Sequence, residues 1–424
     1  MIMKGAIMNK AMKIPLGKPD ISDLERKLVL ETLNSPHLSL GPRLTEFENN
    51  FADYLGVKHA VAVNSGTSAL HLCVKSLGIQ EGDLVATTPF SFVASANCLL
   101  FERARPLFVD IDPATLNIDV NKLEDALREA RKANVRVKGL LPVHIFGRPC
   151  EMEPIMRLAE SYGLCVIEDA CEALGAEIEI SGNGNGNGNG KGNGNGGGDS
   201  WRKAGTFGDC SAFGFYPNKQ LTTGEGGMIV TNDDGIAAAC RSWRNQGRGP
   251  AGTWLQHEKL GYNYRLDELS CALGIAQLSR LAETLEKRRG IAQLYLERLS
   301  SLEGIITPMV NGHERISWFV FVVRLSERFS RDDRDAVLGH LRENGVECSN
   351  YFTPIHLQPF YRSQFGFKEH AFPVTEAASE RTVALPFFNA LSEAEIDYIS
   401  ETLKDALEAI RLRSLRPVPG RPSF

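Results

Sequence analysis

Residues 211–230, Ser-Ala-Phe-Gly-Phe-Tyr-Pro-Asn-Lys-Gln-Leu-Thr-Thr-Gly-Glu-Gly-Gly-Met-Ile-Val, place Lys219 in a turn between two segments that favour strands. Residues 213–216, three of which are aromatic, predict the first strand, and a Pro-Asn pair ends it. A glycine-rich return leads into residues 228–230, which predict the second strand. A lysine confined in this way and partly desolvated can supply the neutral amine that forms a Schiff base. Most lysines in hairpins are solvated, so the turn alone does not decide between the two interpretations.

Two further segments carry useful groups at the end of a predicted strand. Residues 60–72, Ala-Val-Ala-Val-Asn-Ser-Gly-Thr-Ser-Ala-Leu-His-Leu, predict a strand, a turn of small residues and a helix. The first N–H groups of such a helix can bind a phosphate, although Ser and Thr are equally expected there as ordinary caps. Residues 164–173, Leu-Cys-Val-Ile-Glu-Asp-Ala-Cys-Glu-Ala, predict a buried strand that ends in two carboxylates on opposite faces.

An amine, a phosphate cradle and a carboxylate are together the parts of a site for pyridoxal phosphate. A carboxylate paired with the pyridine nitrogen keeps it protonated, so that the ring acts as an electron sink. We assign this role to Asp169 and expect Glu168 to make a structural hydrogen bond or ion pair. Residues 88–95, Thr-Pro-Phe-Ser-Phe-Val-Ala-Ser, follow another predicted strand. Their aromatic rings either stack on the flat cofactor or pack in the core.

The joint order of six motifs resembles the DegT/StrS family of pyridoxal phosphate-dependent nucleotide-sugar aminotransferases over residues 14–407. The motifs are Asn-Ser-Gly-Thr-Ser-Ala-Leu, Pro-Phe-Ser-Phe-Val-Ala, Pro-Val-His-Ile-Phe-Gly, Glu-Asp-Ala-Cys-Glu-Ala, Phe-Tyr-Pro-Asn-Lys-Gln and Gly-Tyr-Asn-Tyr-Arg-Leu. The resemblance implies the aspartate aminotransferase fold (fold type I), an α/β fold. Its large domain has a mostly parallel seven-stranded sheet, and its smaller C-terminal domain is α+β.

The same resemblance implies a role at the cofactor for a set of residues. In chain order they are Gly66 and Thr67 at the phosphate, Phe92 stacked on the ring, Asp169 at the pyridine nitrogen, Glu172 near the ring hydroxyl, Lys219 as the Schiff-base lysine, and Asn263 at the phosphate of the neighbouring subunit in a homodimer. Lys219 and Asp169 are the catalytic residues among them. At Gly214 many relatives have a serine that bonds the phosphate, and Asn218 or the cradle amides would replace that contact.

The chain has room for two domains. We expect a large cofactor-binding domain at residues 14–285 and a small domain at 286–412, between an N-terminal extension at 1–13 and a tail at 413–424. Alternating strand-like and helix-like segments favour a largely parallel sheet in the first two-thirds. Its expected strands include 84–87, 106–109, 139–143 and 165–167. A helical pattern at 266–302 leads to the small domain, where we expect a central strand at 318–323 and helices near 332–344 and 393–410.

Residues 181–198 form an almost pure Gly-Asn repeat. Such a composition buries too little apolar surface to offset its ordering entropy, so we predict a disordered surface insertion. The repeat matches the dinucleotide pattern G-x-G-x-x-G at Gly192, Gly194 and Gly197. The match is spurious, because no predicted strand precedes it and no predicted helix follows it.

Composition limits the possible functions and compartments. A net charge of −5 argues against a general nucleic-acid binder. Nine cysteines, an odd number without Cys-x-x-Cys spacing, favour reduced thiols in a cytoplasmic protein. No signal peptide or membrane-spanning segment is expected. His144 and His356 lie near predicted strand ends, where each is either a substrate contact or a hydrogen-bonded structural residue.

The resemblance implies transamination in two half-reactions. L-glutamate would donate its amino group and leave the cofactor as pyridoxamine phosphate, while the Lys219 amine moves a proton between the donor α-carbon and cofactor C4′. A keto sugar linked to a nucleoside diphosphate would then become an amino sugar for a polysaccharide or a glycosylated natural product. Three alternatives remain: a cyclitol ketone as acceptor, a dehydratase of the same family, and a non-catalytic regulator. The dehydratases carry histidine in place of Lys219, and a regulator would need an added DNA-binding domain.

Overall fold

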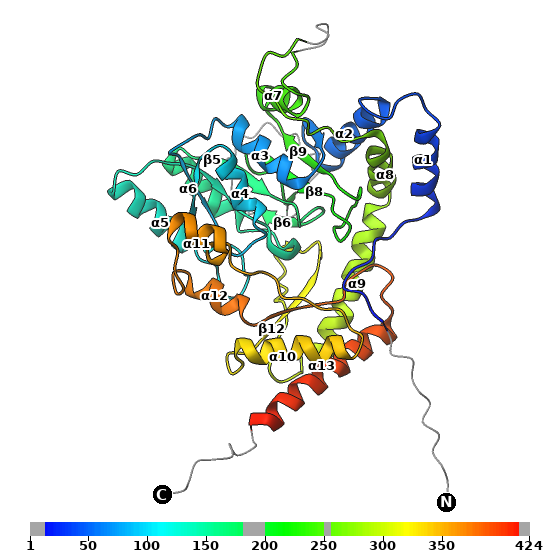
Figure 1. The fold of residues 1–424 in the computed structure, drawn as a ribbon, viewed down its shortest axis with the longest axis vertical. Coiled ribbons are helices and arrows are strands. Elements are labelled where there is room, and N and C mark those ends of the chain that lie inside the picture. The colour runs from blue at the N-terminus through cyan, green and yellow to red at the C-terminus, as the bar shows by residue number, and fades with distance from the viewer. Residues whose placement is uncertain (1–12, 181–199, 250–255, 415–424) are drawn as a thin grey trace, which may run out of the picture.

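The computed structural model describes residues 13–180, 200–249 and 256–414, and its large domain is built on a seven-stranded sheet (Figure 1). Strand β9 is antiparallel to both of its neighbours, whereas the other adjacent pairs are parallel. The expected mostly parallel seven-stranded sheet is therefore confirmed. In sheet order its strands are β1 (His59–Val63), β9 (Gly227–Thr231), β8 (Cys210–Gly214), β5 (Cys165–Asp169), β4 (Val137–Leu141), β2 (Leu84–Thr87) and β3 (Arg105–Phe108).

Helices cover both faces of this sheet because successive side chains of each strand point to opposite sides. In β1, Val61 and Val63 pack beneath helices α3, α4 and α7, whereas Ala60 and Ala62 pack against α2 and α8. Helices α5 and α6 cover β2, β4 and β5 on the face opposite α3 and α4. The helices are α1 (Asp23–Leu33), α2 (Pro42–Leu55), α3 (Gly66–Ser76), α4 (Ala94–Phe101), α5 (Val120–Lys132), α6 (Met152–Tyr162), α7 (Asp234–Arg244) and α8 (Glu268–Ser279).

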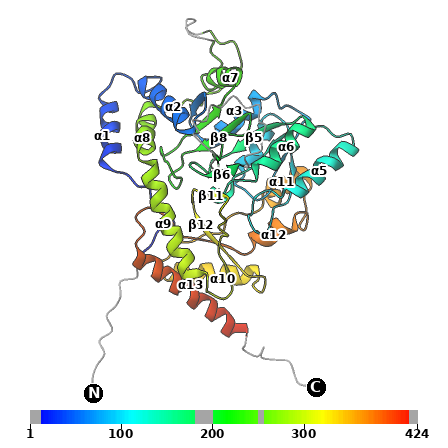
Figure 2. The ribbon, with the colours of Figure 1, turned by 180° about the vertical axis from the view of Figure 1, so that it is seen from behind.

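A long helix, α9 (Leu281–Leu299), runs from the large domain into the small one (Figure 2). The sequence predicted helical structure across residues 266–302, and the structure divides it at Arg280 into α8 and α9. Arg280 caps the C-terminus of α8 with a non-helical φ of −116°. Helix α8 packs against α1 and α2, whereas α9 extends to the second core.

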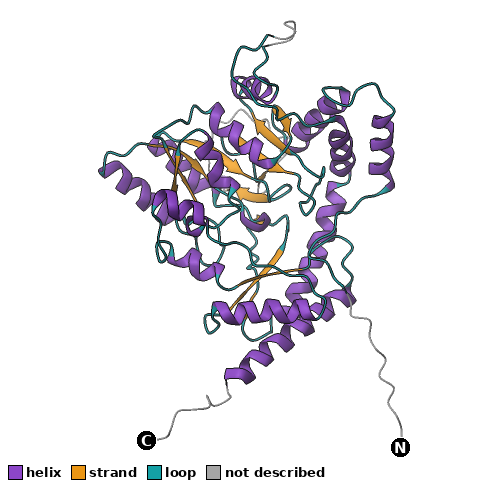
Figure 3. Cartoon of the chain, viewed as in Figure 1, coloured by secondary structure: helices purple, strands orange, loops and turns teal. Residues whose placement is uncertain are grey.

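The small domain has its own sheet, in the order β10 (Ile305–Ile306), β12 (Phe321–Leu325) and β13 (Thr382–Leu385). The strand expected at 318–323 is present as the central strand β12, but it begins at Phe321 and ends at Leu325. The two expected helices are α10 (Arg331–Glu343) and α13 (Glu393–Ser414). Figure 3 shows these helices layered below the strands. Ile14 pairs with Val346 and packs in this core, so the first described residues lie against the small domain. Two short helices, α11 (Pro359–Phe365) and α12 (Pro373–Ser379), lie beside the large domain.

A third sheet, which the sequence did not predict, joins the flanks of the Gly-Asn insertion. Strands β6 (Glu177–Ile180) and β7 (Ser200–Lys203) form an antiparallel hairpin, and β11 (Glu314–Arg315) adds to its edge. The predicted disordered loop at 181–198 lies outside the described residues, as do residues 1–12 and 415–424. Across the described ranges, no helix has the length and apolar character needed to cross a membrane.

Candidate active site

A cavity of about 530 Å³ opens where β5 and β8 end and α3 begins. This is the carboxyl edge of the parallel strands, where open α/β sheets bind their ligands. Asn263 is exposed on the loop before α8 and is absent from the described lining of this cavity. The other expected site residues all line it: Gly66, Thr67, Phe92, Asp169, Glu172 and Lys219.

The start of α3 forms the part of the cavity expected to bind phosphate. Ser65 caps the helix and accepts a hydrogen bond from a backbone N–H of the first turn at 3.0 Å. The backbone N–H groups of Gly66 and Thr67 belong to the first turn of α3. N–H groups in the first turn of a helix have no acceptor within the helix, so they can bind a phosphate. A Cβ atom on Gly227 would lie only 2.5 Å from the carbonyl oxygen of Ser65, so this cradle requires glycine on β9.

The surroundings of Gly214 leave room for a small side chain at this position. A Cβ atom at Gly214 would lie 3.4 Å from Cys171 Cβ, which is an ordinary contact, so the backbone itself would accept a serine. Asn218 also lines the cavity, and its buried Oδ1 has no hydrogen-bond partner among the described residues. A buried polar atom without a partner is uncommon and is compatible with a contact to a bound ligand.

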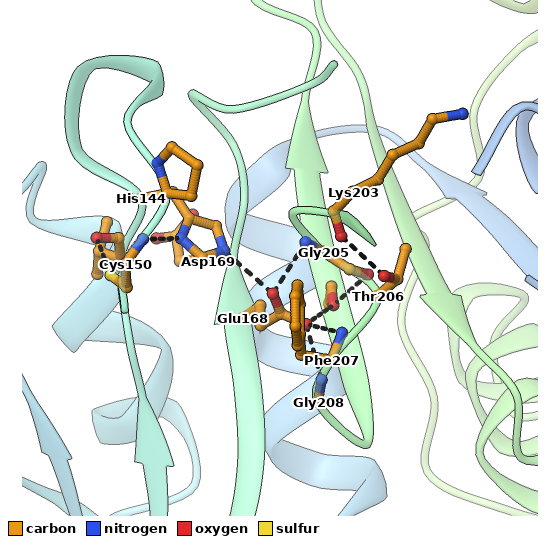
Figure 4. Close-up of polar contacts among 12 residues, drawn as sticks. His144, Cys150, Glu168, Asp169, Lys203, Gly205, Thr206, Phe207 and Gly208 are labelled. Carbon is orange, nitrogen blue, oxygen red and sulfur yellow. Dashed lines mark hydrogen bonds and ion pairs between the residues drawn. The ribbon is translucent and has the colours of Figure 1, made fainter. Parts of the chain in front are cut away.

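The two adjacent carboxylates at the end of β5 have different surroundings. Asp169 lines the cavity, where its carboxylate accepts hydrogen bonds from Ser95 Oγ at 2.7 Å and from the Cys171 N–H at 3.1 Å. Glu168 lies on the opposite side, fully buried against residues 205–208 and His144 (Figure 4). The sequence predicted this division between the faces, with Asp169 directed to the site.

Glu168 organises the loop between β7 and β8. Its carboxylate accepts backbone N–H groups from Gly205 at 2.8 Å, Phe207 at 2.6 Å and Gly208 at 2.7 Å. Burial by itself would raise the pKa of Glu168, but the hydrogen bond from His144 and these N–H groups hold the pKa below its ordinary value. Glu168 is therefore a structural anion, as the sequence indicated.

Both histidines singled out in the sequence are structural. His144 is fully buried, donates to Glu168 with an Nε2–Oε2 distance of 3.1 Å, and accepts the Cys150 N–H at Nδ1 at 3.0 Å. His356 is also fully buried and contacts Glu376 at 3.1 Å. Neither residue lines the cavity, so the structure favours the hydrogen-bonded structural role for both.

Lys219 is held within the cavity, and its side chain is only 14% exposed. Its backbone N–H donates to Tyr216 O at 2.9 Å and closes the turn that the sequence predicted. The Nζ atom lies 3.6 Å from Glu172 Oε1 and 3.8 Å from the centre of the Phe319 ring. Burial raises the pKa of Glu172, and the positive charge of Lys219 opposes that rise. The sequence missed Phe319 because it comes from the small-domain part of the chain, without a motif that marks it as part of the site.

These residues fit pyridoxal phosphate. The amides at the start of α3 suit its phosphate, the Asp169 carboxylate suits its pyridine nitrogen, and the Lys219 amine is available for its aldehyde. Phe92 is 60% exposed at the cavity, so its ring is accessible to a planar ligand. When bound there, the cofactor supplies an electron sink for carbanion chemistry at the donor α-carbon.

Comparison with known proteins agrees with this geometry. The model of the DegT/DnrJ/EryC1/StrS aminotransferase family matches residues 19–404. The chain belongs to this family. The aminotransferase is 37% identical over 402 residues to the GDP-perosamine synthase of Caulobacter vibrioides, covering 94% of this chain and 100% of that protein. It is 36% identical over 405 residues to the spore coat polysaccharide biosynthesis protein SpsC of Bacillus subtilis, covering 93% and 97%.

Solved structures of aminotransferases share this fold. A DegT DnrJ EryC1 StrS aminotransferase from Brucella abortus superposes with a TM-score of 0.79 at 30% identity, covering 90% of this chain and 95% of that one. The expected fold is thereby confirmed. Family membership also confirms the enzyme class, a pyridoxal phosphate-dependent sugar aminotransferase, and its cofactor.

Proposed function

We propose that this aminotransferase moves an amino group from L-glutamate to a keto sugar linked to a nucleoside diphosphate. The observation that carries the proposal is the cavity in which Lys219 lies beside Glu172, with Asp169 in the same lining. The similarity to the GDP-perosamine synthase of Caulobacter vibrioides supports a nucleotide-linked acceptor, and the similarity to SpsC supports a product used in a polysaccharide.

Each residue has a defined task in the proposed reaction. The amides of Gly66 and Thr67 bind the cofactor phosphate, and Phe92 orients the ring by stacking. Asp169 holds the proton on the pyridine nitrogen. Lys219 Nζ would hold the cofactor through its aldehyde, and the free amine would serve to move a proton between the donor α-carbon and cofactor C4′. Glu172, whose pKa is raised by burial, lies beside that amine and would be near the ring hydroxyl of the bound cofactor.

The active unit that we propose is a homodimer with shared sites. Among the described lining residues of the cavity, Lys219 is the only cation, whereas Asp169, Glu172 and Glu225 are acidic. The cofactor phosphate and a nucleoside diphosphate both carry negative charge, so additional donors would help to bind them. Asn263, exposed and outside the cavity of its own subunit, is the proposed donor to the partner's phosphate.

We also place the reaction in the cytoplasm. All of the cysteines, which lie within the described residues, are free thiols. Free thiols are typical of a reducing compartment such as the cytoplasm.

Reduction with borohydride followed by mass spectrometry tests the site assignment. Pyridoxal phosphate should be fixed to Lys219, and Lys219→Ala should fold but lose turnover, since it lacks both the nucleophile and the proton carrier. An adduct on another lysine would contradict the assignment. The pyridoxamine form should then be mixed with a panel of nucleotide-linked keto sugars and cyclitol ketones. Turnover restricted to the cyclitols would replace the proposed acceptor, and no turnover with any nucleotide-linked keto sugar would contradict it.

A further inference from the structure

Arg288, on α9, places its guanidinium between two chain segments that meet at the catalytic lysine. One nitrogen, NH2, donates to the carbonyl oxygens of Asn218 at 3.4 Å and Lys219 at 3.2 Å. The other, NH1, donates to the carbonyl oxygens of Trp318 at 3.2 Å and Phe319 at 3.1 Å. A single side chain thus ties the turn of the large domain to the segment that enters the small domain.

The guanidinium is buried and lacks a carboxylate partner among the described residues. Arg288 is only 4% exposed, and its Nε has no hydrogen-bond partner in the described chain. Burial lowers the pKa of Arg288 to about 10, against the attraction of Asp20. The group therefore stays charged at neutral pH, and four carbonyl dipoles are its main compensation. Burying a cation in this way is unfavourable, which makes a purely incidental placement a poor explanation.

The segments that Arg288 joins carry the two sides of one contact in the site. Lys219 Nζ lies 3.8 Å from the centre of the Phe319 ring, and Arg288 bonds the backbone carbonyl of each of these residues. We propose that Arg288 is a positioning residue, which fixes the Lys219 amine against the Phe319 ring in the geometry for reaction. This inference rests on the proposed function through the role of Lys219.

The planar guanidinium is suited to this task because its N–H groups diverge in a fixed fork. A lysine ammonium donates from a single point, so it keeps the charge but cannot span both segments. A second contact holds the same turn independently of Arg288: Gln220 Nε2 donates to Glu172 O and to Ser317 O, both at 2.6 Å. With that tie intact, loss of the fork should displace the lysine rather than unfold the domain.

The test compares Arg288→Lys and Arg288→Gln with Arg289→Gln in the full-length, cofactor-loaded enzyme. Arg289 is the adjacent residue on α9, where it is exposed and paired with Glu286, so it is a matched control. We expect kcat to fall by about 10- to 100-fold in both Arg288 variants, as small misplacements of reacting groups typically cause. KM for donor and acceptor should change by less than about threefold, because substrate binding is not altered. Borohydride fixation of the cofactor at Lys219 should be slower in the same variants.

A double-mutant cycle identifies the route of the effect. If Arg288 acts by holding Lys219 against Phe319, the losses in kcat for Arg288→Lys and Phe319→Leu should be clearly less than multiplicative in the double variant. Independent effects, or kcat and fixation rates in Arg288→Lys equal to those of Arg289→Gln, would overturn the positioning role. Failure of both Arg288 variants to fold would also overturn it and leave a structural role. Fixation at a different lysine would instead reject the proposed function itself.

Discussion

Glu168 and Asp169 are adjacent carboxylates, and we predict that their amide variants have opposite consequences. Glu168→Gln should lower the free energy of unfolding with little effect on kcat, whereas Asp169→Asn should lower kcat and leave stability nearly unchanged. The contrast follows from their surroundings, since Glu168 is bonded within the core and Asp169 lines the cavity.

The magnitude for Glu168→Gln follows from its hydrogen bonds. With the glutamine oxygen at the Oε1 position, the N–H groups of Phe207 and Gly208 keep their acceptor. The amide nitrogen then faces the Gly205 N–H and His144 Nε2, which bond Oε2 in the wild type at 2.8 and 3.1 Å. His144 accepts the Cys150 N–H at Nδ1, so its proton lies on Nε2 and both groups are donors. Two buried donors without acceptors, at about 1–3 kcal/mol each, give a loss of about 2–6 kcal/mol.

The loss should also depend on pH in a defined direction. The pKa of Glu168 is held below its ordinary value in the folded protein, so the carboxylate contributes stability above the unfolded pKa, near 4.5. This contribution is lost as the pH falls through the folded pKa. The difference in stability between wild type and Glu168→Gln should therefore be largest at neutral pH and should shrink in acid.

Asp169→Asn is expected to be tolerated by the fold. An asparagine can still accept the Cys171 N–H, and its amide can donate to Ser95 Oγ, the two groups bonded at 3.1 and 2.7 Å in the wild type. It cannot keep a proton on the pyridine nitrogen. Loss of one such electrostatic contribution typically lowers kcat by about 100- to 1000-fold.

The assay is denaturant unfolding at a fixed protein concentration, paired with steady-state kinetics. Glu160→Gln serves as a control, because Glu160 is an exposed carboxylate on α6. If Glu168→Gln lies within about 0.5 kcal/mol of that control, as ordinary surface changes do, the assigned hydrogen-bond network is wrong. If Asp169→Asn keeps wild-type kcat, the assignment of its partner is wrong.

Three further predictions concern assembly, the insertion and the cradle. Subunit exchange between Lys219→Ala and Asn263→Ala proteins should restore activity above either parent, because hybrid dimers contain one intact shared site. No gain in activity, despite confirmed exchange and an impaired Asn263→Ala parent, would exclude the shared-site model. Deleting residues 182–197 should leave turnover and thermal stability nearly unchanged, since Ile180 and Ser200 already pair and loop length has only a weak effect on closure entropy. A rise in KM after the deletion would show that the insertion reaches the site. Gly227→Ala would place a Cβ 2.5 Å from the carbonyl that precedes α3, so cofactor affinity by equilibrium dialysis should fall, and unchanged affinity would contradict the role of the cradle.

Local patterns predicted most of the large domain well. Residues 84–87 were expected as a strand and form β2 with the same limits. The strand expected at 165–167 is β5, which ends two residues later, at Asp169. The alternation of side chains along β5 placed Asp169 and Glu168 on different faces, which the structure shows. These successes share one cause: the carboxyl ends of parallel strands meet at one edge, so motifs that follow separate strands converge without knowledge of their contacts.

Contacts between distant segments were not predictable in the same way. Strand β11 has only two residues and joins β6 across more than a hundred positions, so no periodicity marks it. Phe319 and Arg288 belong to segments whose apolar or helical patterns are explained by packing alone. Their relation to Lys219 depends on the direction that α9 takes after Arg280, which is a tertiary property.

This difference has a consequence for how the site is constructed. The groups proposed to do the chemistry lie at strand ends of the large domain, and their positions follow from the sheet. The amine of Lys219 is the exception, because its turn extends beyond β8 and is tied through Arg288 and Gln220 to residues 317–319 of the other segment. Any shift between the two domains would therefore move the lysine relative to Asp169, which stays with the sheet. We therefore expect the alignment of the Lys219 amine with the cofactor ring to be the feature of the site most sensitive to substitutions at the boundary between the two domains.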